Sequence, residues 1–475
     1  MRRLAGILAV MAALAAILDS SAPARAAGPV NWPQFRFGQQ HTGVNPFETT
    51  ITPQNITSVT LHWQGQLGGL VDFSSPAVVN GLAYLGSTDG RLWAFAVGGC
   101  GQPLCTTPRW KSTDLGQIRD SPLVSNGIVY VGSQTSNTSA AGKLDAFSAA
   151  GCGHTVCAPL WQGLAGPQSI LESSPVKGNG LVFAGAFDGK LYAFPASGCG
   201  AATCRPAWTG TTHGHIESTP TVAGGIVYIG SDDGHLYAFK AAGCGTASCR
   251  PLWRGSIGGG PVLQSTPAVS NGTVYIGSQH VLAAFPAIGC GAATCPPLWK
   301  GTFQNEFLGG SPAVFNGFVY IGLEDGVGVF PAAGCGRPAC SPQQLDVAPG
   351  AQALVDSSPT VAAGLVYAGR NTGEIQAWPA KPCGTFQCTN VFRGATGDPV
   401  VSSSPTVVNG KIYIGGAGIF GQGRLFVFGP GPTSRGPFTA RRGPGKITRR
   451  GTQNSALRRV VAVAQARQYL VVGAA

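Results

Sequence analysis

Apolar and polar residues alternate in short runs along residues 74–429, and the same arrangement of runs returns about every 45 residues, a period typical of repeat architectures. Residues 74–95 read SSPAVVNGLAYLGSTDGRLWAF, and residues 218–239 read STPTVAGGIVYIGSDDGHLYAF. The apolar runs are short and are bounded by turn residues, and the repeat shows no helical period. We therefore expect four short antiparallel strands in each unit.

Turn signals separate these predicted strands. Asn-Gly follows the first strand, as at Asn80-Gly81, and supplies the positive φ angles that a two-residue type I′ hairpin requires. Asp-Gly follows the second strand, as at Asp233-Gly234, and the third strand has the form of Leu236–Phe239. In five units the fourth strand holds a tryptophan: Trp110, Trp161, Trp208, Trp253 and Trp299. In two other units we expect Leu345 and Phe392 to take its place.

A Ser/Thr-Pro pair, or its equivalent, opens each unit, and there are eight of them. The prolines are Pro76, Pro122, Pro175, Pro220, Pro267, Pro312, Pro359 and Pro405. Four-stranded antiparallel units repeated in this way are typical of a β-propeller. A β-solenoid is the alternative, but it repeats over shorter units and does not need hairpin turns. The sequence therefore predicts an all-β fold, an eight-bladed β-propeller of four-stranded antiparallel blades.

All 14 cysteines fall into seven C-x4-C pairs, each bracketing the turn between a third and a fourth predicted strand. A bond within a pair closes the hairpin on itself and contributes about 2 kcal/mol, less any strain. Metal binding is the alternative, but no histidine recurs with the pairs and zinc needs four converging ligands. We predict seven local disulfides: Cys100/Cys105, Cys152/Cys157, Cys199/Cys204, Cys244/Cys249, Cys290/Cys295, Cys335/Cys340 and Cys383/Cys388.

The eighth unit has no cysteine pair, and the ring must close somewhere. Its third strand is Leu425–Phe428, whereas a spare tryptophan strand, LHWQG at residues 61–65, precedes the first Ser-Pro. A propeller commonly completes one blade from both chain ends, and an unpaired strand edge would recruit other chains. We therefore predict that Trp63 lies in the last blade, near Phe428 and not near Phe95.

The two ends of the chain differ from the repeat. Residues 1–26 begin with Arg2 and Arg3, followed by a short apolar run and Ala24-Arg25-Ala26, which predicts a secretory signal peptide. A membrane anchor is the alternative, for which the apolar run is short. Residues 430–475 turn to Arg, Gly and Pro and predict a basic, disordered tail, which leaves residues 27–429 for the propeller. These ends carry +2 and +9 of the net charge of +12, so the propeller is nearly neutral and gives no sign of nucleic-acid binding.

Export and paired cysteines together predict an extracellular or periplasmic protein, because disulfides persist in oxidising compartments. We expect a monomer with no transmembrane segment in the mature chain.

The repeat SSPxVxxGxVYxGSxDGxLYAF, followed by a tryptophan strand, resembles the pyrroloquinoline quinone-type eight-bladed propeller repeat. The resemblance covers about residues 30–429, and WPQFRFGQQHTG at residues 32–43 is similar to segments that open such domains. The family includes quinoprotein dehydrogenases and non-catalytic propellers, such as the lipoprotein of the outer-membrane β-barrel assembly machinery. The repeat is therefore specific for the fold and weak for activity.

The resemblance implies what a cofactor site would need. Dehydrogenases of the family hold calcium on acidic and amide oxygens and have a disulfide between adjacent cysteines near the quinone. This chain has no adjacent cysteines, and no calcium ligand can be carried over from the family. We expect no catalytic, cofactor or metal residue; the alternative is an alcohol or sugar dehydrogenase that uses pyrroloquinoline quinone and calcium.

The links between a fourth strand and the next first strand should gather around one mouth of the channel. The residue three before each proline varies, and these positions hold Phe73, Arg119, Glu172, Glu217, Gln264, Gly309, Asp356 and Ser402. His213, His215 and Glu217 alternate and could hold a metal ion, or could be ordinary solvated loop residues.

Loops on rigid scaffolds often carry function, so we expect a secreted, non-catalytic scaffold that binds a protein or a cell-envelope polymer at this rim. A solvated rim that only positions strands is the alternative. The candidate binding residues are Arg119, Glu172, His213, His215, Glu217, Gln264, Phe303, Glu306 and Asp356.

Overall fold

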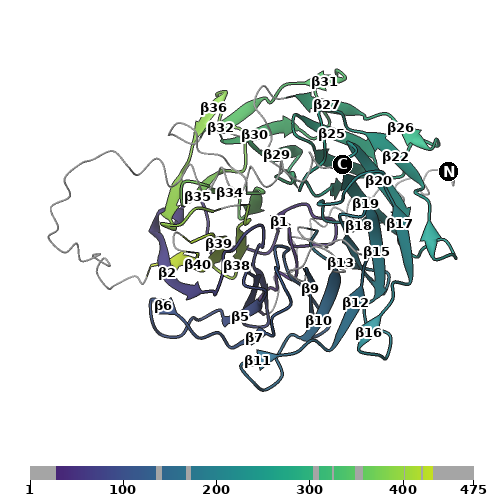
Figure 1. Ribbon diagram of the computed structural model, residues 1–475. Helices are drawn as coiled ribbons and strands as arrows, with labels where there is room; N and C mark the ends of the chain where they lie inside the picture. Colours follow the sequence, from purple (N-terminus) through teal and green to yellow (C-terminus); the bar gives the residue numbers. More distant parts are fainter. Residues whose placement is uncertain are drawn as a thin grey trace, which may run out of the picture. The chain divides into compact units, whose positions relative to one another are not determined.

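The computed structural model describes residues 28–134, 142–166, 173–302, 310–323, 326–347, 357–400, 402–418 and 421–431. These residues form eight sheets, and Figure 1 shows the sheets as blades around a central axis. Besides strands they contain one short 3-10 helix, η1 (Ile56–Ser58). Across the described ranges no helix is long and apolar enough to cross a membrane. The eight-bladed propeller is confirmed; the predicted signal peptide and the predicted tail beyond Gly431 lie outside the described residues.

Each blade has four antiparallel strands, counted outward from the axis. The first strands are β3 (Ala77–Val79), β8 (Leu123–Ser125), β13 (Val176–Gly178), β18 (Thr221–Ala223), β23 (Ala268–Ser270), β28 (Ala313–Phe315), β33 (Thr360–Ala362) and β38 (Thr406–Val408). The second strands are β4 (Leu82–Gly86), β9 (Ile128–Ser133), β14 (Leu181–Gly185), β19 (Ile226–Ser231), β24 (Thr273–Gly277), β29 (Phe318–Leu323), β34 (Leu365–Arg370) and β39 (Lys411–Gly416).

The outer strands complete the blades. The third strands are β5 (Leu92–Ala96), β10 (Lys143–Ser148), β15 (Lys190–Pro195), β20 (His235–Lys240), β25 (Val281–Pro286), β30 (Gly326–Pro331), β35 (Glu374–Pro379) and β40 (Arg424–Pro430). The fourth strands are β7 (Trp110–Ser112), β12 (Trp161–Leu164), β17 (Trp208–Thr211), β22 (Trp253–Ser256), β27 (Trp299–Thr302), β32 (Gln344–Val347), β37 (Phe392–Ala395) and, in blade 8, β2 (Val59–Gln66). Positive φ angles at Asn80, Asn126, Asn271, Asn316 and Asn409 confirm the Asn-Gly hairpins.

The N-terminal strand closes the ring. Strand β2 pairs antiparallel with β40, which places Trp63 opposite Val427 and Leu61 opposite Phe428. Trp63 is buried in the last blade, as predicted. The expectation that Trp63 stays away from Phe95 is wrong, because their ring centroids are 6.3 Å apart. A fourth-strand tryptophan faces the next blade, and Trp253 meets Phe285 at the same 6.3 Å.

One tryptophan substitute differs from the prediction. Ala284 of β25 lies opposite Trp299, and the equivalent Val329 of β30 lies opposite Gln344. Gln344, and not Leu345, therefore takes the tryptophan's place in blade 6. Hydrophobicity suggested leucine, but strand register decides the position. Phe392 takes the place in blade 7, as predicted, because it lies opposite Ala377.

The seven disulfides form as predicted, with Cα–Cα distances between 5.6 Å and 6.1 Å. The sequence did not predict a second role of these loops. Each contributes a short fifth strand that runs parallel to the fourth strand of the preceding blade. These strands are β6 (Leu104–Cys105), β11 (Val156–Cys157), β16 (Thr203–Cys204), β21 (Ser248–Cys249), β26 (Thr294–Cys295), β31 (Ala339–Cys340) and β36 (Gln387–Thr389).

The two cysteines of each pair bracket the turn as predicted, and the second cysteine also belongs to a short strand paired with the preceding blade. Cys388 shows this most clearly. It is bonded to Cys383 as predicted, with a Cα–Cα distance of 6.1 Å, but it is the middle residue of the three-residue strand β36. Cys388 lies opposite Asp346 of β32 in the preceding blade and is 4% exposed. The turn folds back onto that blade, so the disulfide also holds a strand between blades.

The Ser/Thr before each proline joins neighbouring blades at the axis. The backbone N–H of Ser75 donates to Ser121 Oγ at 2.9 Å, and the N–H of Ser404 in blade 8 donates back to Ser75 Oγ at 2.8 Å. Equivalent bonds link most of the other neighbouring blades. The Ser/Thr-Pro landmark is therefore a contact between blades, and it makes the inner ring rigid.

The glycine before each first cysteine, in most blades, packs on the tryptophan of the preceding blade. Gly243 has φ +80°, and a Cβ there would lie 2.7 Å from Trp208. Gly245 has φ +82° but open space around it. We expect Gly245→Ala to cost about 1 kcal/mol for backbone strain alone. Gly243→Ala should cost about 2–4 kcal/mol, because overpacking against Trp208 adds to that strain.

Urea unfolding of both variants under non-reducing conditions measures this difference. Equal losses of stability would show that the glycine serves the turn and not the packing between blades.

Candidate functional site

The N-terminal residues 30–48, here called the strap, run around the channel against the first strands. The N–H groups of Val222, Val269 and Val314 donate to strap carbonyls at 3.0, 2.9 and 2.9 Å. β1 (Val44–Asn45) continues the strap as a strand parallel to β33. The resemblance marked residues 32–43 as an opening segment, but the repeat gave no sign that they line the channel. We call the mouth with the Asn-Gly hairpins the strap mouth and the opposite one the rim mouth.

Arg36 extends from the strap into the channel and is 2% exposed. Its Nη1 donates to Pro359 O at 2.9 Å and its Nη2 to Pro312 O at 2.7 Å. In blades 4, 7 and 8 a threonine after the proline makes this bond, as Thr360 does to Pro405 O at 2.7 Å. Burial lowers the pKa of Arg36 to about 9. Arg36 therefore serves as donor where the repeat lacks threonine, since alanines stand at the equivalent positions of blades 5 and 6.

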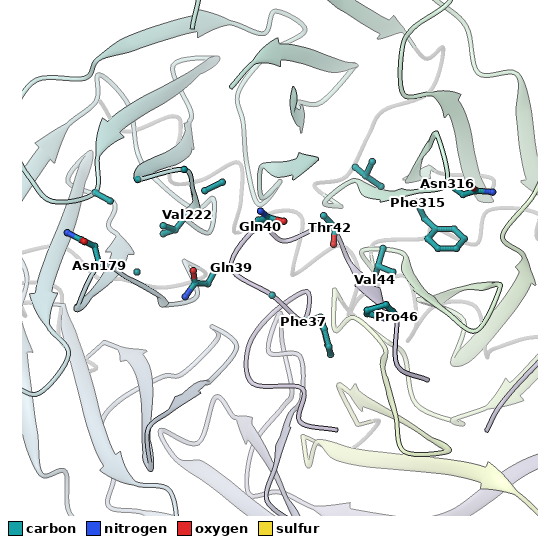
Figure 2. Close-up of a pocket in the computed structure, with 17 residues that line it drawn as sticks. Phe37, Gln39, Gln40, Thr42, Val44, Pro46, Asn179, Val222, Phe315 and Asn316 are labelled. Atoms are coloured by element: carbon teal, nitrogen blue, oxygen red, sulfur yellow. The ribbon is translucent and has the colours of Figure 1, made fainter. Parts of the chain in front are cut away.

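A pocket of about 860 Å³ lies at the strap mouth. Figure 2 shows Gln39, Gln40 and Thr42 of the strap between Asn179 and Asn316 of two hairpin turns. Phe37 and Phe315 supply aromatic surface, and none of the residues lining the pocket is charged. The pocket therefore suits an uncharged group. The repeat did not reveal this pocket, because half of it comes from the strap.

The rim mouth carries those predicted candidates that the structure describes. Arg119 Nε lies 3.4 Å from Asp72 Oδ2, and its guanidinium lies 6.0 Å from the centre of the Phe73 ring. Phe73 has φ +64°, which is rare for a bulky residue and marks a strained backbone. The structure thus brings Arg119 together with a carboxylate and an aromatic ring from the neighbouring link.

The two histidines at the rim have different neighbours. His215 stacks on Phe187 with ring centroids 5.6 Å apart, and its Nδ1 lies 4.0 Å from Asp232 Oδ2. His213 lies edge-on to Tyr237. Glu217 and Gln264 are half-buried on their links. In the described part of the chain no three His, Cys, Asp or Glu side chains gather as metal ligands. Glu172, Phe303, Glu306 and Asp356 lie outside the described residues.

Two buried carboxyl groups in blade 2 were not singled out by the sequence. Asp120 stands where most blades have the first serine of Ser-Ser-Pro, and its Oδ2 accepts from Gly132 N at 2.5 Å. Burial raises the pKa of Asp120 well above 3.8, and the neighbouring Asp145 raises it further. Burial also raises the pKa of Asp145, which accepts hydrogen bonds from Ser133 and Gln162. The sequence signal that could have revealed Asp120 is the replacement of the repeated first serine by a carboxyl residue.

Comparison with known proteins supports this class of fold. Residues 49–243 match a family model described as outer membrane protein assembly factor BamB. No curated protein matches the chain significantly. The solved structure of BamB from Moraxella catarrhalis is 15% identical with a TM-score of 0.56, covering 78% of this chain and 99% of that one.

Quinohemoprotein alcohol dehydrogenase from Comamonas testosteroni is 14% identical with a TM-score of 0.61, covering 86% of this chain and 82% of that one. A computationally designed protein, Ika8, is 15% identical with a TM-score of 0.53, covering 76% of this chain and 98% of that one. At these identities the structures show the fold alone. The repeat, the eight blades and the family match over residues 49–243 together support a propeller of the pyrroloquinoline quinone type.

Asp120 should make stability depend on pH. The serines at equivalent positions donate to the next blade, as Ser218 Oγ does to Ser265 O at 2.8 Å, and only a protonated carboxyl can do the same. Because the folded-state pKa of Asp120 is raised, its stabilising contribution is complete below its unfolded pKa and is lost as pH rises through the folded value. Asp120→Ser restores a donor that does not titrate. We expect the variant to unfold at a higher temperature than the natural chain at about pH 8, and the difference to shrink toward about pH 4.

Thermal unfolding at several pH values measures the difference. A constant difference between the two proteins across this range would contradict the account of Asp120.

Proposed function

We propose that the protein is an exported, non-catalytic binding scaffold that holds a partner protein at its rim mouth. The observation that carries the proposal is the contrast between the two parts of each blade. The strands are fixed by repeated contacts between blades, whereas the rim links vary from blade to blade and carry the charged and aromatic side chains. Variable loops on a rigid ring suit recognition of a partner.

The charges at the rim favour a protein over a polymer of one charge sign. Asp72 and Arg119 form one pair of opposite charges, and Arg424 Nε lies 3.8 Å from Asp398 Oδ2 at another link. Both signs of charge therefore occur at the mouth. Complementary contacts to such a rim need a partner surface with both signs, as folded proteins have. The matched family's description as an assembly factor agrees with a role among proteins.

Two observations support the choice of scaffold over quinoprotein dehydrogenase. All cysteines lie in disulfides between residues five apart, so no disulfide joins adjacent cysteines. The described residues also bring no set of three acidic or histidine side chains together. The described residues therefore do not fit the calcium and quinone group that the resemblance implies.

Export is supported by the disulfides of the folded part. All seven lie in loops on the outer edges of the blades. Such bonds persist in the periplasm or outside the cell and are reduced in the cytosol. The apolar, arginine-led start of the sequence agrees with this location.

Phe73 offers a clean test at the rim. Phe73→Gly removes the aromatic ring but relieves the positive φ, so the thermal midpoint should stay equal or rise. Proteins that cross-link to the natural protein in an extract of its own cell envelope should cross-link several-fold less to Phe73→Gly. The matched control is Phe47→Ala, an aromatic residue 42% exposed and carried by the strap, which should change nothing.

Equal capture by all three proteins, or binding only to envelope polymer, would contradict the proposal. Turnover of an alcohol or sugar in a dye-reduction assay with pyrroloquinoline quinone and calcium would also overturn it.

A further inference from the structure

The fourth strand of a blade would be an open sheet edge if nothing lay beside it. In blade 4, β22 is covered by β26 from the next cysteine loop, and Arg254 N donates to Ala293 O at 2.9 Å. In blade 1, β7 is covered by β11 in the same way, and Thr113 N donates to Cys157 O at 2.9 Å. Sheets that end in an open edge tend to pair with other chains, so this covering strand protects the ring.

Blade 7 lacks the covering strand. Its sheet order is β1-β33-β34-β35-β37, so β37 is the outermost strand among the described residues. The cause is ring closure. The next blade, blade 8, takes its third strand β40 and its fourth strand β2 from opposite ends of the chain. No cysteine loop joins these two strands, and none is available to cover β37.

The N-terminal segment takes over only one of the two roles of the missing loop. Ile51, Ile56 and Val59 pack in one buried cluster with Phe392 of β37 and fill the space between blades 7 and 8. The side-chain contact between the blades is thus restored. The backbone edge of β37 stays uncovered, since no described strand pairs with its outer side.

Exposure along the fourth strands shows the same difference. The second residue of this strand is half-buried in every covered blade: Gln64, Lys111, Gln162, Thr209, Arg254, Lys300 and Leu345. In β37 the equivalent Arg393 is exposed. Val391, which leads into the strand, is 38% exposed. The outer side of β37 is therefore accessible where the others are covered.

We propose that the outer edge of β37 binds a short extended segment of a partner polypeptide, which adds to blade 7 as a parallel fifth strand. The seven covering strands show what such an edge accepts. Each is two or three residues long, runs parallel to the fourth strand and buries a small cysteine side chain after an exposed residue. The partner segment is therefore extended, with a small uncharged residue at the buried place, and is recognised mainly through its backbone.

This site lies on the outside of one blade and does not depend on the rim. The rim variant Phe73→Gly should leave it intact, so failure of one proposal is distinguishable from failure of the other.

Hydrogen exchange of the full chain tests the site in two steps. First, the outward-facing amides of Arg393 and Ala395 should exchange about tenfold or more faster than the equivalent amides of Arg254 and Ser256 in the free protein. The alternate amides bond within the blade, as Thr396 N does to Gly373 O at 2.9 Å, and should not differ. Second, seven synthetic peptides that copy the covering loops, each with cysteine replaced by alanine, serve as probes at millimolar concentration. At least one should slow exchange in β37 saturably and leave β22 unchanged.

The variant Ala395→Pro removes one outward backbone donor and should abolish the slowing, and unchanged exchange in β22 shows that the variant is folded. The proposal is overturned if the amides of Arg393 and Ala395 are already as protected as those of Arg254 and Ser256, or if no peptide slows their exchange. Protection that rises with protein concentration would assign the edge to a second copy of this chain and would also overturn it.

Discussion

The contact between one blade and the next is the interaction on which the rest of this structure depends. A single four-stranded blade has two apolar faces and cannot bury either alone, so each blade is stable only between neighbours. Most of the residues that recur in the repeat units take part in that contact. The fourth-strand tryptophan packs on the next blade's phenylalanine and loop glycine, as Trp208 does on Phe239 and Gly243. The tyrosine of the second strand also reaches across, since Tyr84 donates to Ala149 O at 2.8 Å.

Departures from the repeat come in matched pairs, which supports this view. In blade 6 the tryptophan is replaced by Gln344, and the glycine that would contact it in blade 7 is replaced by Pro382. Gln344 Oε1 instead accepts a hydrogen bond from Cys383 N at 3.0 Å. Closure of the ring also breaks the regularity of the repeat. It leaves blade 8 without a cysteine loop and blade 7 with an uncovered edge.

The sequence predicted the parts of the fold that the repeat specifies. Blade number, hairpin turns, local disulfides and closure by Trp63 all follow from period, turn chemistry and the one spare strand. The covering strands, such as the one that holds Cys388, were missed because two or three residues pairing with a distant segment leave no periodic signal. The strap and Arg36 were missed because they occur once, and their partners are backbone carbonyls with no sequence signature. At the candidate site, the sequence could place Arg119 on the rim, but not beside Phe73 and Asp72, because that contact depends on how two links fold.

The central claim is that a strand from the chain's start completes the last blade and couples all eight. Thermal unfolding, with light scattering to follow association, tests it most directly on two shortened chains. A chain that begins at Trp32 keeps β2, whereas a chain that begins at Val71 loses the strap and β2 and leaves the outer side of β40 unpaired. The account predicts that the second chain melts at a clearly lower temperature and aggregates, while the first stays close to the natural protein. If the chain that begins at Val71 remained monomeric and melted at the same temperature, closure by β2 would be contradicted.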